Sequence, residues 1–247
     1  MSRSNPHENG AANPATRWFE WNGENGTVRY YDKEKKQSVE VGSDFTFILL
    51  DRLGTVGGWH ERSKSGIYAN EVKDTRADVL IVKAFKGGTL AEGLYKDIKD
   101  RVNSEGGQFV ANCYVAFKNG GEKLALGSMK FKGGALGAWM DFEKEHRADL
   151  YTKAIRIHGF TEGKKGRVVF RVPVLSVVPI ASDTNAAAVA LDKQVQDFLK
   201  GYFKRTKRDQ AEATPAQHVR DEDMDGDEPP PYDDEPVHAI DASDIPF

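Results

Sequence analysis

Seven segments of this 247-residue chain alternate apolar and polar side chains over the length of a β-strand, and they are rich in β-branched and aromatic residues. Alternation of this kind is typical of strands with one buried face. The segments are residues 27–31, 45–50, 79–85, 109–117, 123–131, 154–160 and 167–178. The chain is therefore predicted to be mainly β.

Turn signals separate these segments, and two of them predict hairpins. Asn119-Gly120-Gly121 and the glycine-bounded residues 163–166 each stand between two predicted strands. Short loops that contain Asn-Gly or glycine connect antiparallel strands, because glycine accepts the backbone conformations that such turns need.

Residues 134–153 have helical rather than strand spacing, with Leu136, Trp139 and Phe142 near one side and charged residues largely opposite. A helix between central strands and a final hairpin is the layout of an OB-fold, a five-stranded Greek-key barrel whose open face and loops bind oligonucleotides. Further strands and a short helix near residues 90–102 predict an elaborated OB-fold.

A second helix is predicted to begin at residues 182–184 and to run through residues 186–207 with an apolar stripe. The apolar stripe of this helix is expected to pack on the barrel or on another subunit. In the second case the protein would be a homo-oligomer. The expected organisation is a disordered N-terminus (1–15), an OB-fold domain (16–181), this helix (182–208) and a disordered acidic tail (209–247).

The charge of the chain is strongly asymmetric. Residues 221–247 hold 11 acidic residues and no Lys or Arg, so this segment is too polar to fold alone. The remaining residues include 35 basic and 27 acidic side chains, a net charge of +8. A basic domain favours a polyanionic partner.

The tail ends in Asp241, Asp244, Ile245, Pro246 and Phe247, which have the character of a short binding motif. Two apolar side chains and a terminal carboxylate follow a polar segment, and the proline limits the conformations that are lost on docking. This ending resembles the acidic tip of bacterial and phage single-stranded DNA-binding proteins, which close on Asp-Ile-Pro-Phe.

The resemblance implies a phage or mobile-element single-stranded DNA-binding protein that coats exposed strands in DNA replication, recombination or repair. It also implies that residues 241 and 244–247 recruit replication and repair proteins. The alternative is a DNA-mimicking or protein-interaction adaptor that acts through its acidic tail.

Binding of single strands without sequence preference needs cations along the phosphates and aromatic faces for the bases. On one predicted strand, Arg29 and Tyr31 share a side and Tyr30 lies on the other, so the core is expected to take one of the two tyrosines. Residues 57–68 are expected to be a mobile binding loop that carries Trp59, His60, Arg62 and Lys64. The opposing interpretation is that Trp59 packs against the barrel and the cations only solubilise the loop.

Strand alternation selects Tyr114 and four further cations, and the last predicted hairpin contributes three more, where a long OB-fold loop can close over a strand. For each of these cations, a solvated surface role is the alternative. Tyr114 is the preferred stacking platform, because it lies opposite the apolar side of its strand. The candidate cations are Lys118, Lys130, Lys132, Arg156, Lys164, Lys165 and Arg167.

No enzyme, metal or cofactor site is predicted. The glycine-rich pieces lack the spacing of a phosphate loop, and the six histidines show no metal-ligand spacing. Cys113 is the only cysteine, so no disulfide or Cys-based zinc site forms within one chain. A cytoplasmic protein without membrane segments is expected.

Overall fold

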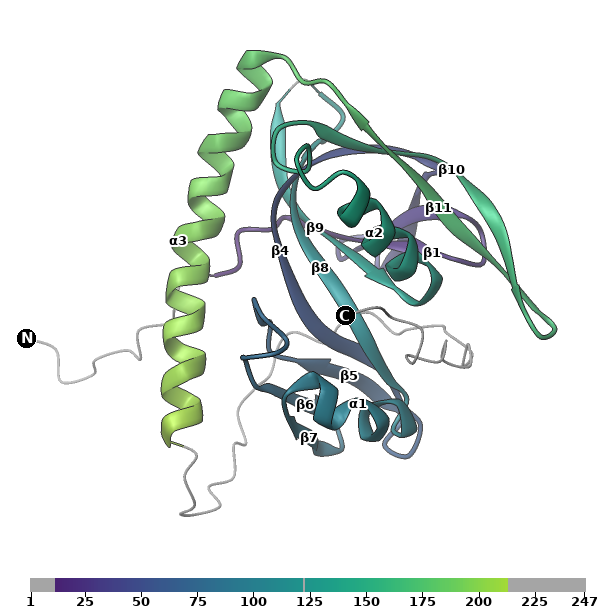
Figure 1. Cartoon of the computed structure of the whole chain (residues 1–247), viewed down its shortest axis with the longest axis vertical. Helices are drawn as coiled ribbons and strands as arrows, with labels where there is room; N and C mark the ends of the chain where they lie inside the picture. The colour runs from purple at the N-terminus through teal and green to yellow at the C-terminus, as the bar shows by residue number, and fades with distance from the viewer. Residues whose placement is uncertain (1–11, 122, 213–247) are drawn as a thin grey trace, which may run out of the picture.

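The computed structural model describes residues 12–121 and 123–212, which form eleven strands and three helices within these ranges (Figure 1). The strands are β1 (Arg17–Asn22), β2 (Thr27–Asp32), β3 (Gln37–Gly42), β4 (Asp44–His60), β5 (Ser65–Ala69), β6 (Leu80–Ala84), β7 (Gly88–Gly93), β8 (Gly107–Lys118), β9 (Leu124–Lys132), β10 (Ala154–Lys165) and β11 (Val168–Val178). The helices are α1 (Tyr95–Ser104), α2 (Gly133–Glu145) and α3 (Ser182–Glu212).

The predicted mainly β character is confirmed, as are the seven strands and both hairpins. The three predicted helices are present, but α2 ends at Glu145 rather than at residue 153, and α1 begins at Tyr95, after β7. Strands β1, β3, β5 and β7 lie outside the seven predicted segments, and β4 continues ten residues beyond residue 50. At the ends, Asn13 and Ala15 are ordered parts of the fold, and α3 extends to residue 212, past the expected start of the tail.

All eleven strands belong to one sheet, in which β3-β2-β1-β9-β8-β4-β5-β6-β7 are successive neighbours and the β10–β11 hairpin branches from β4. The sheet is open and does not close into a barrel within the described residues. Among the described residues, β11 pairs only with β10, because the edge of β9 is taken by β1, which runs parallel to it.

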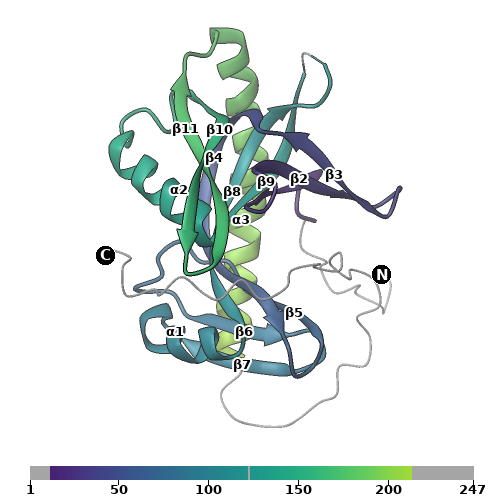
Figure 2. The ribbon, with the colours of Figure 1, turned by 90° about the vertical axis from the view of Figure 1, so that its right-hand side faces the viewer.

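Two hydrophobic cores lie on the side of the sheet that α1 and α2 cover, which we call the inner side. The upper one holds Phe19, Phe47, Val115 and Phe131 beneath Trp139 of α2. The lower one is built by β5, β6, β7 and the lower part of β4, and it is covered by α1. Figure 2 shows α1 and α2 on the same side of the sheet, at the left of the view, with β2 and β3 extending to the right.

The long helix α3 covers the middle of the opposite side, which we call the outer face. Its residues Val195, Phe198 and Leu199 pack against β4, β8 and β9 in a third hydrophobic cluster that includes Tyr114. Figure 1 shows α3 running beside these strands. The outer face is therefore divided into a covered centre and uncovered flanks.

Candidate nucleic-acid interface

Strand register places five of the predicted DNA-binding residues on the uncovered parts of the outer face. Arg29 pairs with Glu20 across β1 and β2, and Glu20 pairs with Lys130 across β1 and β9. Because side chains alternate along a strand, Tyr31 and Lys132 lie on the same side as these residues. Trp59 joins them through β8 and β4, where Gln108 pairs with Gly57.

Glu20 sits among the cations at the upper end of this face. Its carboxylate accepts a 2.8 Å hydrogen bond from Arg29 Nε and lies 3.6 Å from Lys132 Nζ. The three side chains are each about one-fifth to one-quarter exposed, so all three reach solvent. A phosphate that approaches here meets two cations whose charge is partly offset by one carboxylate.

The expected mobile loop at residues 57–68 is instead a β-hairpin, in which β4 pairs with β5 around a turn at residues 61–64. Gly57-Gly58 therefore does not signal mobility. A Cβ atom on Gly58 would lie 2.2 Å from the Gly106 oxygen, so glycine permits the close approach of β4 and β8. Trp59 is half-buried on the outer face, so its side chain is partly packed and partly accessible to solvent.

The assignment of Tyr114 as a stacking platform is wrong, because its side chain is 0% exposed. Alternation correctly places it on the outer face, but α3 covers that position and Phe198 contacts its ring. Its hydroxyl donates to Glu71 Oε2 at 2.9 Å, and Asn13 Nδ2 donates to the hydroxyl oxygen at 3.2 Å. A base cannot reach this ring.

Glu71 completes a polar network beneath α3. Its carboxylate also accepts from the Asn112 amide, and its backbone N–H donates to the Tyr202 hydroxyl at 2.7 Å. Burial raises the pKa of Glu71 above its ordinary value of 4.5, against the opposing effect of the hydrogen bonds from Tyr114 and Asn112. The network joins α3 to the sheet.

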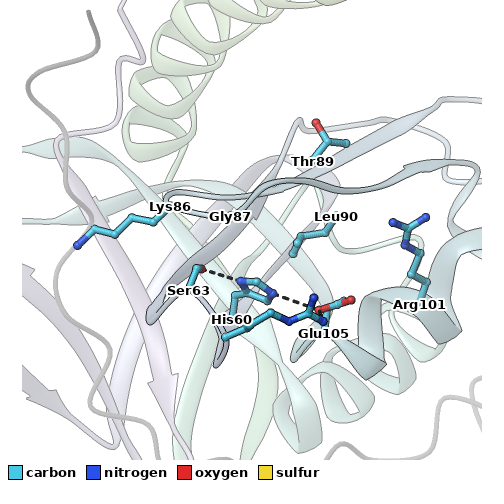
Figure 3. Close-up of a pocket in the computed structure, with 9 residues that line it drawn as sticks. His60, Ser63, Lys86, Gly87, Thr89, Leu90, Arg101 and Glu105 are labelled. Carbon is cyan, nitrogen blue, oxygen red and sulfur yellow. Dashed lines mark hydrogen bonds and ion pairs between the residues drawn. The ribbon is translucent and has the colours of Figure 1, made fainter. Parts of the chain in front are cut away.

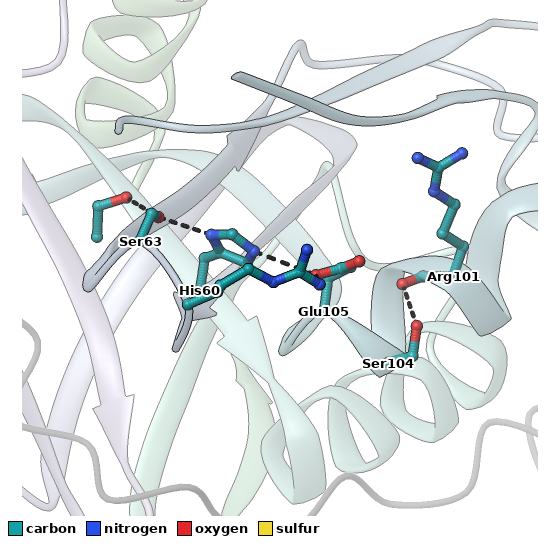
Figure 4. A network of polar contacts seen from close by, with 7 residues as sticks. His60, Ser63, Arg101, Ser104 and Glu105 are labelled. Atoms are coloured by element: carbon teal, nitrogen blue, oxygen red, sulfur yellow. Dashed lines mark hydrogen bonds and ion pairs between the residues drawn. The ribbon is translucent and has the colours of Figure 1, made fainter. Parts of the chain in front are cut away.

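His60 is also wrongly assigned to DNA, because it is 5% exposed. Its Nδ1 lies 2.6 Å from Ser63 Oγ and its Nε2 lies 3.1 Å from Glu105 Oε2 (Figure 4). These contacts connect the β4–β5 hairpin to the end of α1. Both ring nitrogens are occupied, so this histidine holds the hairpin in place.

A polar pocket of about 430 Å³ lies beside this histidine. Arg62, Lys86 and Arg101 contribute its cations, and Glu105 lies between them and contacts Arg62 at 3.4 Å. The Lys86 and Arg101 side chains extend in different directions rather than toward one point (Figure 3). The pocket therefore lacks the convergent donors of a tight phosphate site.

The other predicted cations do not gather with the outer-face group. Arg62 and Lys64 lie in the exposed turn of the β4–β5 hairpin, Lys118 ends β8 far from Lys130 and Lys132, and Lys164, Lys165 and Arg167 surround the tip of the β10–β11 hairpin. Arg156 on β10 forms an ion pair with Asp44, which lowers the pKa of that carboxyl group.

The outer face carries three exposed aromatic residues that were not among the predicted sites. They are Trp18 on β1, Tyr68 on β5 and Phe85 just beyond β6. Strand alternation could have identified Trp18 as a surface residue, because Trp18 and Glu20 alternate with Phe19 and Trp21, which are buried. Tyr68 and Phe85 gain significance only through the pairing of β5 with β6.

The tip residues Asp241, Asp244, Ile245, Pro246 and Phe247 lie outside the described residues. Comparisons with family models, curated proteins and solved structures found no match to this chain. Within residues 12–121 and 123–212, no three His, Cys, Asp or Glu side chains are grouped to hold a metal ion. The helices in those ranges are too short or too polar to cross a membrane.

Proposed function

We propose that this protein binds single-stranded DNA on the outer face of its sheet and coats exposed strands in DNA replication, recombination or repair. The observation that carries the proposal is the strand register, which brings Arg29, Tyr31, Trp59, Lys130 and Lys132 onto one side. Cations interleaved with aromatic rings provide the two contacts that unpaired strands need.

The proposal includes an OB-type arrangement for β4, β8, β9, β10 and β11. In its favour, these strands form the neighbouring series β9-β8-β4-β10-β11, in which β4 pairs with both β8 and β10, and α2 lies between β9 and β10 in the sequence. Where an OB barrel would close, β1 intervenes, and its turn accepts a 2.7 Å hydrogen bond at the Gly23 oxygen from the Arg171 N–H of β11.

Tryptophan fluorescence tests DNA binding at the proposed place. Trp18 and Trp59 lie on the outer face, whereas Trp21 and Trp139 are buried in the inner core. Titration with an oligo(dT) strand should quench the fluorescence of the wild-type protein, with an affinity that falls steeply as salt rises. The Trp18→Phe/Trp59→Phe variant should lose most of the quenching while it still binds.

Two results would contradict the proposal. Quenching that persists in Trp18→Phe/Trp59→Phe would move the DNA away from the outer face. No binding by the full chain at low salt would remove the DNA-binding function, and the adaptor that acts through the acidic tail would then take its place.

The second part of the proposal assigns partner recruitment to the C-terminal tip. Its support is the sequence Asp-Ile-Pro-Phe, an apolar end on an acidic segment. Removal of Phe247 should abolish capture of DNA-processing proteins and leave oligo(dT) affinity equal or higher. Weaker DNA binding by this truncation would contradict the division between a DNA-binding body and a recruiting tip.

A further inference from the structure

The strongest unassigned feature of the outer face is an exposed aromatic pair below the predicted cations. Tyr68 and Phe85 are 41% and 47% exposed, and their ring centroids lie 4.5 Å apart with an interplanar angle of 32°. Two large rings in contact with each other but uncovered by the fold mark an interaction site more often than isolated exposed residues do.

A cation belongs to the same group. Lys83 pairs directly with Tyr68 across β5 and β6, it is exposed, and it forms no ion pair with any residue that the structure describes. Alternation along β6 places Lys83 and Phe85 on the same side. We call Tyr68, Lys83 and Phe85 the β5–β6 platform.

The β5–β6 platform is continuous with the proposed DNA-binding surface. Gly57 on β4 pairs with Gln108 on one side and with Tyr68 on the other, and Trp59 pairs with Gly66, whose oxygen accepts from the Phe85 N–H at 3.1 Å. From Arg29 on β2 to Lys83 on β6 there are six strand spacings. At about 4.8 Å each, they span roughly 29 Å of sheet.

We infer that the β5–β6 platform is a second base-stacking subsite. It receives unpaired bases of the same DNA strand whose phosphates are held by Arg29, Lys130 and Lys132. Tyr68 and Phe85 present ring faces to the bases, and Lys83 meets a neighbouring phosphate. This inference rests on the proposed function and adds to it that binding strength depends on strand length. A strand must cross β9, β8 and β4 to occupy both groups.

Single-stranded DNA fits this surface better than a protein segment does. A protein partner would be expected to seal two adjacent rings with apolar side chains, but Lys83 stands directly beside them and the same face continues into Lys132 and Lys130. Aromatic faces with adjacent cations match a chain of bases and phosphates.

The test compares Tyr68→Ala/Phe85→Ala with the wild type on oligo(dT) strands of two lengths, about 4 and about 16 nucleotides. The matched control is Tyr151→Ala/Phe160→Ala, which removes an exposed tyrosine and an exposed phenylalanine from elsewhere on the chain. The platform variant should lose about tenfold in affinity for the long strand and no more than about twofold for the short one. The control should bind both strands like the wild type.

Each other outcome overturns the inference. Unchanged affinity for the long strand would mean that no base stacks on the platform. An equal loss for both lengths would make the platform the primary site rather than a second one. A shift in sedimentation with unchanged DNA affinity would assign the rings to contact between copies of this chain. If the wild type binds neither strand, the proposed function itself fails.

Discussion

The Tyr114 hydroxyl donates a 2.9 Å hydrogen bond to Glu71, and both groups lie beneath α3. This bond connects β8 to the segment between β5 and β6, and Tyr202 connects the same segment to α3. Tyr114, which strand alternation predicts to be a DNA-binding residue, is therefore a structural link between the sheet and α3.

Replacement of Tyr114 should affect stability far more than DNA binding. Tyr114→Phe leaves the buried Glu71 carboxylate without one donor and should lower the free energy of unfolding by about 1–3 kcal/mol. Tyr114→Ala also leaves a cavity and should cost about 3–5 kcal/mol. Urea unfolding measures both values. Tyr114→Ala with normal stability but markedly weaker oligo(dT) binding, together with normal binding by Tyr114→Phe, would reinstate this ring as a stacking platform.

Glu71 should make stability depend on pH in a direction that its environment sets. Burial raises the pKa of its carboxyl group in the folded protein, so the folded state holds this proton more tightly than the unfolded state does. The contribution of Glu71 to the free energy of unfolding is fully present at pH values below its ordinary pKa of 4.5. This contribution is lost as the pH rises through the raised pKa of the folded state.

The variant Glu71→Gln isolates that contribution. The free energy of unfolding of the wild type, minus that of Glu71→Gln, should fall as pH is raised from 4.5 toward neutrality. Urea titrations of both proteins at several pH values provide the difference. A difference that rises with pH would show that the hydrogen bonds from Tyr114 and Asn112 outweigh burial.

Glu20 should weaken DNA binding, because its carboxylate offsets the charge of Arg29 and Lys132. Glu20→Gln should bind oligo(dT) a few times more tightly at low salt, and the advantage should shrink as salt screens the charges. Loss of the ion pairs should cost about 1 kcal/mol of stability. Glu145→Gln, which removes an exposed carboxylate from α2 on the inner side of the sheet, is the comparison variant. Equal or weaker binding by Glu20→Gln would place the phosphates elsewhere.

The regular parts of this fold could be predicted from sequence because they depend on local patterns. Alternation in residues 109–117 correctly separates Ala111, Cys113 and Val115, which enter the inner core, from Asn112 and Tyr114. The same periodicity identifies α2 through Leu136, Trp139 and Phe142, which are buried as expected.

What alternation could not show is which face of a strand a distant element covers. Tyr114 is buried by Phe198, which lies 84 positions later in the chain and reaches it only when α3 docks. Tyr68 and Phe85 meet because β5 pairs with β6 across a loop that has no strand pattern. Gly57-Gly58 has the composition of a flexible loop, yet the approach of β8 determines its structure.

The location of the DNA is tested most directly by two triple variants that remove the same charges. Arg29→Ala/Lys130→Ala/Lys132→Ala takes one arginine and two lysines from the outer face, and Lys164→Ala/Lys165→Ala/Arg167→Ala takes the same three from the β10–β11 hairpin tip. The measurement is the slope of log affinity for oligo(dT) against log salt, to which each neutralised phosphate contributes about 0.7.

We expect the outer-face triple variant to bind at least about tenfold more weakly at low salt and to show a slope that is shallower by about 2, while the hairpin variant keeps the wild-type slope. If the hairpin variant shows the shallower slope and the outer-face variant does not, single-stranded DNA is held by the protruding hairpin and the outer face is not its binding site.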